Sequence, residues 1–346
     1  MVRRRIKPSH YTWLKWALAW LGAAIAVFWI ISTILMINFY YSYRTEPEVI
    51  GVSFSQKQAE RYGVDWRANY TALLKELDFK HFRIAAYWDR IEPQRDQFDF
   101  SELDWMVSQA RTHNARLTIV VGQKNIRYPE CYYPSWLDTD NKQLTAERAR
   151  TMVEQVANRY KDESAVEAWQ VENEFLLHSF GECPAQNLTR QQLKDEIAIV
   201  RKEDPEKPIA LTQSDQFGFP VFGPFADYFG FSMYRWSYRE GFGYFRYPQP
   251  GLYNWWKAAW VETLTGQHVK IHELQAEAWG KTGNEYLPLS EQYKTMNPAQ
   301  LRDNLQYARD TQIRRIDLWG AEWWYWLKVS KGQPAIWNEV KALLSS

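Results

Sequence analysis

The chain has 346 residues, of which 46% are apolar, so a sizeable core is possible and global disorder is excluded. Its 42 basic and 41 acidic residues nearly balance and are mixed along the chain, which gives no footprint for binding nucleic acid. The chain has two cysteines and no Cys/His cluster with zinc-ligand spacing, so we expect neither a bound metal nor another cofactor.

The N-terminal segment has the pattern of a membrane anchor. Residues 1–12 are basic, and an uncharged, largely apolar run from Trp16 to Ile37 is long enough to cross a bilayer as a helix. A cleaved signal peptide is the alternative, but the run is longer than a signal core and lacks a convincing small-x-small cleavage site. We therefore expect a cytoplasmic tail at 1–12, a single-pass anchor at 13–41 and a linker at 42–48. The positive cluster precedes the span, so the rest of the chain is expected outside the cytoplasm.

Beyond residue 48, strand-like and helix-like segments alternate. The strand candidates are residues 49–54, 81–87, 116–121, 166–171, 208–212, 228–233, 269–274 and 316–319. The helix candidates are residues 66–77, 100–112 (with Ser101 as its N-cap), 145–160, 189–203, 253–265, 298–311 and 338–344. This rhythm predicts a (β/α)8 barrel, a TIM barrel, over residues 49–346. A doubly wound sheet is the rival, but no Gly-x-Gly-x-x-Gly follows the first strand.

Polar side chains gather at the predicted C-terminal ends of the strands, which form one ring at the mouth of a barrel. The fourth strand runs into Asn173 and Glu174, and the seventh contains Glu273. A carboxyl group beside a neutral amide suits sugar cleavage, which needs a proton donor and a group that bonds a sugar hydroxyl. We therefore expect Glu174 and Glu273 to face each other as a catalytic pair. The ring would also hold Ser53, Arg83, Gln123, Ser214, Asp215, Tyr234 and Trp319.

Three segments resemble clan A glycoside hydrolases. The run RYKDESAVEAWQVENE, residues 159–174, is similar to their fourth-strand signature, in which Asn-Glu carries the acid/base. FRIAAYWDRIEP (82–93), followed by FDFSELD (98–104), resembles the second strand and its loop in cellulase-like and beta-galactosidase-like members. IHELQAE (271–277) resembles the seventh strand, which carries the nucleophile. The resemblance covers roughly residues 49–330 and implies a metal-independent, retaining glycosidase.

The resemblance implies roles for the acidic residues. Glu174 would be the acid/base and Glu273 the nucleophile. Glu172 is the alternative to Glu174, because both are polar on one side of the strand, but the Asn-Glu order favours Glu174. Glu277 is the alternative nucleophile, because it shares side parity with Glu273. Glu273 lies closer to the apolar part of the strand, which favours it.

The resemblance also implies substrate-binding residues. Arg83 would support the ionisation of Glu273, and Tyr234 would hydrogen-bond the same carboxylate. Asn173 would bond the sugar 2-hydroxyl, a contact that strengthens in the transition state. Arg83 as an ordinary buried ion-pair partner and Tyr234 as a core tyrosine are the alternatives.

Aromatic residues are unusually frequent, with 19 Trp and 21 Tyr. They fit either a large core or a groove on which sugar rings stack. Trp319, after the eighth strand, would floor the subsite of the cleaved sugar, and Trp88, after the second, is expected to contact substrate. His178 and Asp215 are further loop candidates for such contacts. Specificity is expected to lie in the long loops 122–140, 175–188, 216–226 and 235–252.

The two cysteines, Cys131 and Cys183, follow the third and fourth strands, whose loops are neighbours at the barrel mouth. A disulfide between them is expected, and two unpaired thiols are the alternative. The whole pattern predicts a membrane-anchored glycosidase acting on an oligo- or polysaccharide. A transglycosylase that remodels envelope glycans and a carbohydrate-binding barrel without turnover are the rival functions.

Overall fold

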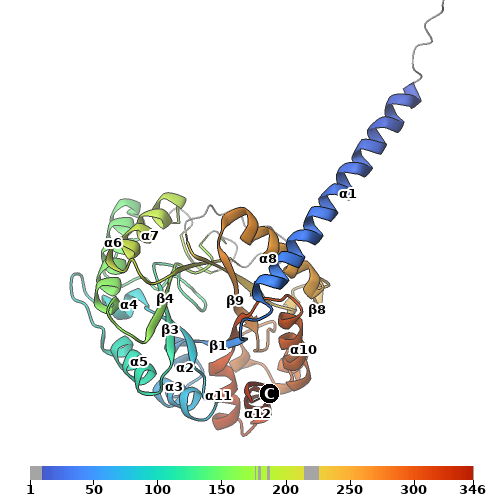
Figure 1. Ribbon diagram of the computed structural model, residues 1–346. Helices are drawn as coiled ribbons and strands as arrows, with labels where there is room; N and C mark the ends of the chain where they lie inside the picture. Colours follow the sequence, from blue (N-terminus) through green and yellow to red (C-terminus); the bar gives the residue numbers. More distant parts are fainter. Residues whose placement is uncertain (1–9, 176, 178–180, 185–187, 214–225, 346) are drawn as a thin grey trace, which may run out of the picture.

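Eight parallel strands close into a barrel in the computed structural model, which describes residues 10–175, 177, 181–184, 188–213 and 226–345 (Figure 1). Their order around the barrel is β1-β10-β9-β6-β5-β4-β3-β2. The expected (β/α)8 fold is therefore confirmed. The strands are β1 Val49–Phe54, β2 His81–Ala85, β3 Arg116–Val121, β4 Val166–Val171, β5 Ile209–Gln213, β6 Tyr228–Met233, β9 His268–Gln275 and β10 Arg315–Trp319.

Helices surround the barrel in the part of the chain that the structure describes (Figure 1). They are α2 Gln56–Arg61, α3 Trp66–Lys75, α4 Trp88–Ile91, α5 Ser101–Thr112, α6 Lys142–Tyr160, α7 Arg190–Glu203, α8 Gly251–Thr265, α9 Leu289–Gln292, α10 Pro298–Arg309, α11 Ala321–Ser330 and α12 Ala335–Leu344, with a 3-10 turn at Asn284–Tyr286. A short antiparallel hairpin, β7 Trp236–Arg239 with β8 Gly243–Arg246, occupies the region expected to be a loop.

The alternation of residues along β1 explains how the barrel separates an apolar layer from a polar interior. Phe54 packs outward, with its ring 5.1 Å from that of Tyr70 on α3. Ser53, between two apolar neighbours, points inward, where its hydroxyl accepts a hydrogen bond from Arg83 Nη1 at 3.1 Å. Successive strand residues face opposite sides of a sheet, so one short strand supplies both layers. The interior near the mouth is therefore polar, and its buried groups are hydrogen-bonded to one another.

Some helix boundaries differ from the sequence expectation because of capping. Phe100, not Ser101, is the N-cap of α5, and the backbone N–H of Ser101 donates to Asp99 Oδ1 at 2.8 Å. The next long helix, α6, starts three residues early because Asn141 caps it by accepting from the backbone N–H of Leu144. The helix α11 was not predicted, since its run of tryptophans has no polar face to give a helical period.

The N-terminal helix α1, His10–Tyr43, is unbroken and projects away from the barrel after passing beside α8 (Figure 1). The span Thr12–Tyr43 is long and apolar enough to cross a membrane. The helix continues into the segment expected to be a linker at 42–48, and Tyr43 explains why. Its hydroxyl donates to Glu262 Oε1 on α8 and lies 2.7 Å from His268 Nδ1 at the start of β9.

Candidate active site

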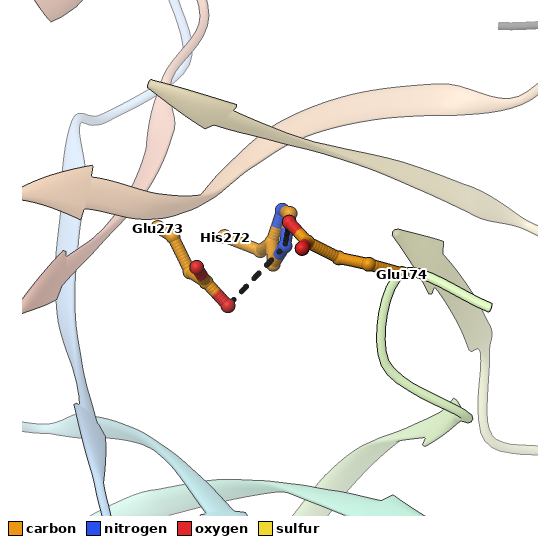
Figure 2. Close-up of side chains that lie close together, drawn as sticks. All are labelled: Glu174, His272 and Glu273. Carbon is orange, nitrogen blue, oxygen red and sulfur yellow. Dashed lines mark ion pairs between the residues drawn. The ribbon is translucent and has the colours of Figure 1, made fainter. Parts of the chain in front are cut away.

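Two glutamates from different strands meet at the barrel mouth with a histidine between them (Figure 2). Glu174 lies just past the end of β4, and Glu273 lies on β9. One carboxylate oxygen of each and a ring nitrogen of His272 all lie within 4.8 Å of one another. All three side chains are buried. The structure thus brings together the two carboxyl groups expected to form the catalytic pair.

Arg83 on β2 is the centre of the hydrogen-bond network around this pair. Its guanidinium contacts Glu273 Oε1 at 3.1 Å and donates to Asn173 Oδ1 and to Gln170 Oε1. The side chain is fully buried, so its charge requires a buried anionic partner. Because the oxygen of Asn173 accepts from Arg83, the amide nitrogen of Asn173 is left to donate, and it lies 3.5 Å from Glu130 Oε1.

Opposing influences set the protonation of Glu273. Burial and the neighbouring carboxyl of Glu174 raise its pKa, whereas Arg83 and the hydroxyl of Tyr234 oppose the rise. Tyr234 donates to Glu273 Oε2 at 2.8 Å. Two buried carboxyl groups this close hold one proton between them more readily than two negative charges. Arg83 and Tyr234 both stabilise the anion on Glu273, and the hydroxyl of Ser232 donates to Glu174 Oε1.

His272, between the two carboxyl groups, is a neutral hydrogen-bond donor. Burial lowers its pKa to about 3, and its Nδ1 has no hydrogen-bond partner among the described residues. The proton is therefore assigned to Nε2, which lies 3.2 Å from Ser232 Oγ and 3.6 Å from a carboxylate oxygen of each glutamate. Gly230 makes room for the ring, since a Cβ at that position would lie 2.8 Å from His272 Nδ1.

The segment after β4 is held by contacts to the loop after β3. Lys124 is fully buried, and its ammonium donates to the backbone carbonyl of Glu174 at 3.0 Å. Glu172 turns away from Glu273, and its carboxylate accepts from the backbone N–H groups of Gln123 and Lys124 at 2.9 and 2.6 Å. Glu172 therefore holds the loop after β3 in place, and Glu174 is the glutamate that lies beside Glu273.

Glu172 also forms a buried acid pair with Glu196 on α7. Burial raises the pKa of both groups, and the charge of Glu196 adds to the rise at Glu172. The pair requires space, which Gly122 provides at a φ of +132°, because a Cβ there would lie 2.5 Å from the carboxyl carbon of Glu172.

Glu277 belongs to a second buried charge cluster beside the first. Its Oε1 accepts from Arg127 Nη1 and from Trp319 Nε1, the latter at 2.9 Å. Arg127 also donates to Glu322 and lies over the Trp319 ring, 4.0 Å from its centroid. Glu277 is thus committed to Arg127, and Glu273 is the carboxylate opposite Glu174. One face of Trp319, the expected floor of a subsite, is covered by a guanidinium.

Trp88 lies elsewhere. Its indole is 1% exposed, donates to Glu92 Oε2 at 2.9 Å and contacts the ring of Tyr133 edge-on within the main hydrophobic core. The expectation that Trp88 contacts substrate is therefore wrong for this structure, because the residue begins α4 and its side chain turns into the core. The other expected contacts, His178 and Asp215, lie outside the described residues.

Cys131 and Cys183 are joined by a disulfide. It links the loop after β3 to the loop after β4, the same two segments that Lys124 and Glu172 hold together. The rim beside the two catalytic candidates is thus held together by a covalent bond and by hydrogen bonds.

Sequence reasoning missed the groups that support the site. These are His272, Ser232, Lys124, Glu130 and Arg127. His272 directly precedes Glu273, so strict alternation would turn it outward, but the register shift between β6 and β9, where Phe231 pairs with Ile271 and Ser232 with Glu273, leaves it as an extra residue. Lys124, Arg127 and Glu130 sit on a long loop whose path has no readable period.

Comparison with known families agrees with this geometry. The model of the family Cellulase (glycosyl hydrolase family 5) matches residues 45–312. The chain belongs to this family. The match covers seven of the eight barrel strands and ends just before β10.

A curated protein and solved structures are similar to this chain. Beta-galactosidase Bga of Halorubrum lacusprofundi is 25% identical over 144 residues, which is 34% of this chain and 19% of that protein. A beta-galactosidase structure from Rahnella sp. R3 has a TM-score of 0.58 at 13% identity and covers 86% of this chain and 55% of its own. A GH5_18 structure from Bifidobacterium longum subsp. longum, in complex with Manβ1-4GlcNAc, has a TM-score of 0.59 at 15% identity, with 86% and 78% covered. This family 5 chain therefore spans about a fifth of the curated relative, and the structural likenesses establish its fold.

The carboxyl group of Glu130 gives this family 5 barrel a testable pH dependence. Burial raises its pKa from 4.5 to about 8, with Lys124 opposing the rise. Between these two values the folded state holds a proton that the unfolded chain releases, so the free energy of unfolding should fall as pH rises. One such group contributes a slope of at most about 1.4 kcal/mol per pH unit.

We expect Glu130→Gln to remove this part of the slope between about pH 5 and 8. Denaturant unfolding at each pH measures it. The matched control is Glu147→Gln, which neutralises an exposed carboxyl on α6 and should leave the slope unchanged. A Glu130→Gln variant with the wild-type slope would refute a raised pKa at this position.

Proposed function

We propose that this chain is a retaining glycoside hydrolase that cleaves O-glycosidic bonds by a double displacement on Glu273 and Glu174. The observation that carries the proposal is the approach of the two carboxyl groups, whose nearest oxygens lie within 4.8 Å. Retaining enzymes hold their two carboxyl groups about 5–5.5 Å apart, whereas inverting enzymes need about 6.5–9.5 Å to admit a water molecule.

In the first step, Glu273 attacks the anomeric carbon and the bond to the leaving oxygen breaks. Arg83 and Tyr234 favour the anion of Glu273 that this attack requires. Glu174 donates its proton to the leaving oxygen. In the second step, Glu174 takes a proton from water, the water oxygen bonds to the anomeric carbon, and Glu273 is released as a carboxylate. No metal takes part.

Two further groups are proposed to bind the sugar. The amide nitrogen of Asn173 donates to the 2-hydroxyl, because the amide oxygen is already committed to Arg83. Trp319 supplies the floor of the subsite through whatever part of its ring Arg127 leaves uncovered. Because the Arg127 guanidinium lies on the Trp319 ring, we propose that a sugar hydroxyl or ring oxygen contacts the guanidinium, in addition to stacking of the sugar on the ring.

We also propose that α1 is an uncleaved, single-pass anchor with its basic end in the cytoplasm. Ser32 is 1% exposed, and Phe39 and Tyr43 are part of the main hydrophobic core. Removal of α1 would expose the surface that these residues cover. A helix that the folded domain needs in this way is unlike a signal peptide, which leaves the mature protein.

The experiment that tests the reaction is a screen of aryl glycosides with the full chain in detergent, followed by proton NMR of the first product. The panel includes β-galactosides and β-mannosides, suggested by the name of one relative and the bound ligand of another, and other β-linked sugars. The proposal expects the first-formed sugar to keep the anomeric configuration of the substrate. Inversion, or hydrolysis of no member of the panel, would contradict it. Added acceptor sugars separate hydrolysis from transglycosylation.

A further inference from the structure

Helix α1 packs against α8 through a contact that is rich in aromatic side chains. The hydroxyl of Ser32 accepts hydrogen bonds from the indoles of Trp256 and Trp260 at 3.2 and 3.0 Å. One turn earlier, the ring of Phe28 stacks on Trp260, with centroids 5.6 Å apart. One turn later, the backbone carbonyl of Met36 accepts from a third indole on α8. The contact therefore begins at Phe28 and continues to the end of the helix.

The length of α1 determines where this contact lies relative to a bilayer. A helix needs about 20 residues to cross the hydrocarbon core. If the core begins at Thr12, the first residue of the apolar span, it extends to about Ile31. If it coincides with the uncharged run, it ends at Ile37. In both cases the part of α1 inside the hydrocarbon core extends beyond Phe28. A tilted helix would need still more residues to cross the core.

The overlap between span and contact is therefore between four and ten residues. At about 1.5 Å per residue this is about 6–15 Å of depth. The lower part of this range matches the depth of about 5–10 Å at which interfacial helices lie. The side of the barrel that carries α8 must enter the same layer as the span itself.

The outward surface of α8 has the composition that such a layer requires. Leu252 and Leu264 are 57% and 62% exposed, and the indoles of the α1 contact are half-buried. Lys257 is 3% exposed, with its ammonium over the ring of Phe231. The other charged group on α8, Glu262, bonds Tyr43. By comparison, α7, the helix that follows β4, exposes Arg190 and Lys194.

We propose that α8 is a second membrane element, an interfacial helix that inserts its outward face into the extracytoplasmic leaflet beside α1. This inference rests on the proposed span of α1 and adds a lipid contact made by the barrel itself. Tryptophan side chains favour the interface between headgroups and acyl chains, and an apolar face without charge completes the match to lipid. The barrel is therefore fixed against the bilayer, and its mouth is held at a constant height above it.

The test measures depth at single introduced cysteines in full-length protein reconstituted in phosphatidylcholine vesicles. The two native cysteines are disulfide-bonded, so each variant has one free thiol. The α8 positions are Leu264→Cys and Leu252→Cys, labelled with a fluorophore and exposed to lipids that carry a nitroxide at a known acyl position. Ala23→Cys in α1 reports the span. Ser101→Cys on α5, which lies across the barrel from α8 (Figure 1), reports the solvent side.

We expect lipid nitroxides to quench the labels at Leu264→Cys, Leu252→Cys and Ala23→Cys and not at Ser101→Cys. Iodide in the buffer should give the reverse order. Quenching at Ala23→Cys without quenching at either α8 position would overturn the inference while leaving the anchor intact. An α8 label shielded from both quenchers would show a protein contact, such as a second copy, and would also overturn it. Thermal unfolding of each variant confirms that the labelled chain is folded.

Discussion

Glu174→Gln is expected to separate the two steps of the reaction. For glycosides with poor leaving groups, kcat/KM should fall by about 10²- to 10⁴-fold, the usual contribution of general acid–base catalysis. An aryl glycoside with an acidic phenol needs no proton, so its first step should survive. The slow second step should then give a burst of phenol equal to the enzyme concentration. Azide, which needs no general base, should restore turnover. Stopped-flow absorbance of the released phenol measures both effects.

Glu273→Gln should behave differently, because no covalent intermediate can form without the attacking carboxylate. Neither the burst nor the azide rescue should occur, even with the most acidic phenol. The matched control is Glu167→Gln, which neutralises a carboxyl at the opposite end of β4, where its partner is His81. If Glu167→Gln has rates close to the wild type, the losses in Glu174→Gln and Glu273→Gln are due to where these two carboxyl groups lie and not to the loss of any one carboxyl group. A burst in Glu273→Gln, or its absence in Glu174→Gln, would reverse or abolish the proposed roles.

Arg127→Met is expected to destabilise the fold by about 3–5 kcal/mol, the usual cost of leaving a buried charge without its partner. Arg127 is 7% exposed and is paired with both Glu277 and Glu322. Its loss leaves two buried carboxylates facing each other and removes the contact with the Trp319 ring. Burial already raises the pKa of Glu322. The loss of stability in Arg127→Met should therefore be smaller at acidic pH, where protonation of the carboxylate removes the unpaired charge. Denaturant unfolding at pH 5 and pH 8 measures both effects.

Arg90→Met is the matched control, because Arg90 also pairs with two glutamates, Glu60 and Glu102. Arg90 is 38% exposed, so this loss should cost no more than about 1 kcal/mol. The double variant Arg127→Met/Glu322→Gln should recover part of the stability, since one buried charge is removed with its partner. Equal effects of Arg127→Met and Arg90→Met would mean that the buried cluster contributes no more than a surface ion pair.

Much of the fold was predictable from local patterns. Short apolar strands followed by amphipathic helices gave the eight-stranded barrel, and the positions of Glu174 and Glu273 at strand ends followed from it. The hairpin β7–β8 was not predicted because its strands are four residues each and lie among glycines and aromatics. Helix α1 ran past the expected linker because Tyr43 binds Glu262, a contact between residues 219 positions apart.

The supporting groups of the site illustrate the limit of sequence reasoning. Arg127 and Glu130 both have positive φ values, 71° and 70°, in a loop between β3 and α6. No local sequence pattern shows which carboxylates Arg127 pairs with, since that depends on the path of the loop that carries it. The prediction that Trp88 contacts substrate failed for a related reason. An aromatic residue after a strand fits a groove or a core equally well, and the turn of α4 decided for the core.

The most direct measurement is mass spectrometry of the enzyme after incubation with a 2-deoxy-2-fluoro aryl glycoside of the sugar found in the screen. The fluorine slows both steps, and the reactive phenol restores the first, so a retaining enzyme accumulates its covalent intermediate. We predict a single glycosyl adduct, mapped by peptide fragmentation to Glu273. An adduct on Glu277, or an enzyme that hydrolyses the parent glycoside yet forms no adduct, would contradict the proposed mechanism.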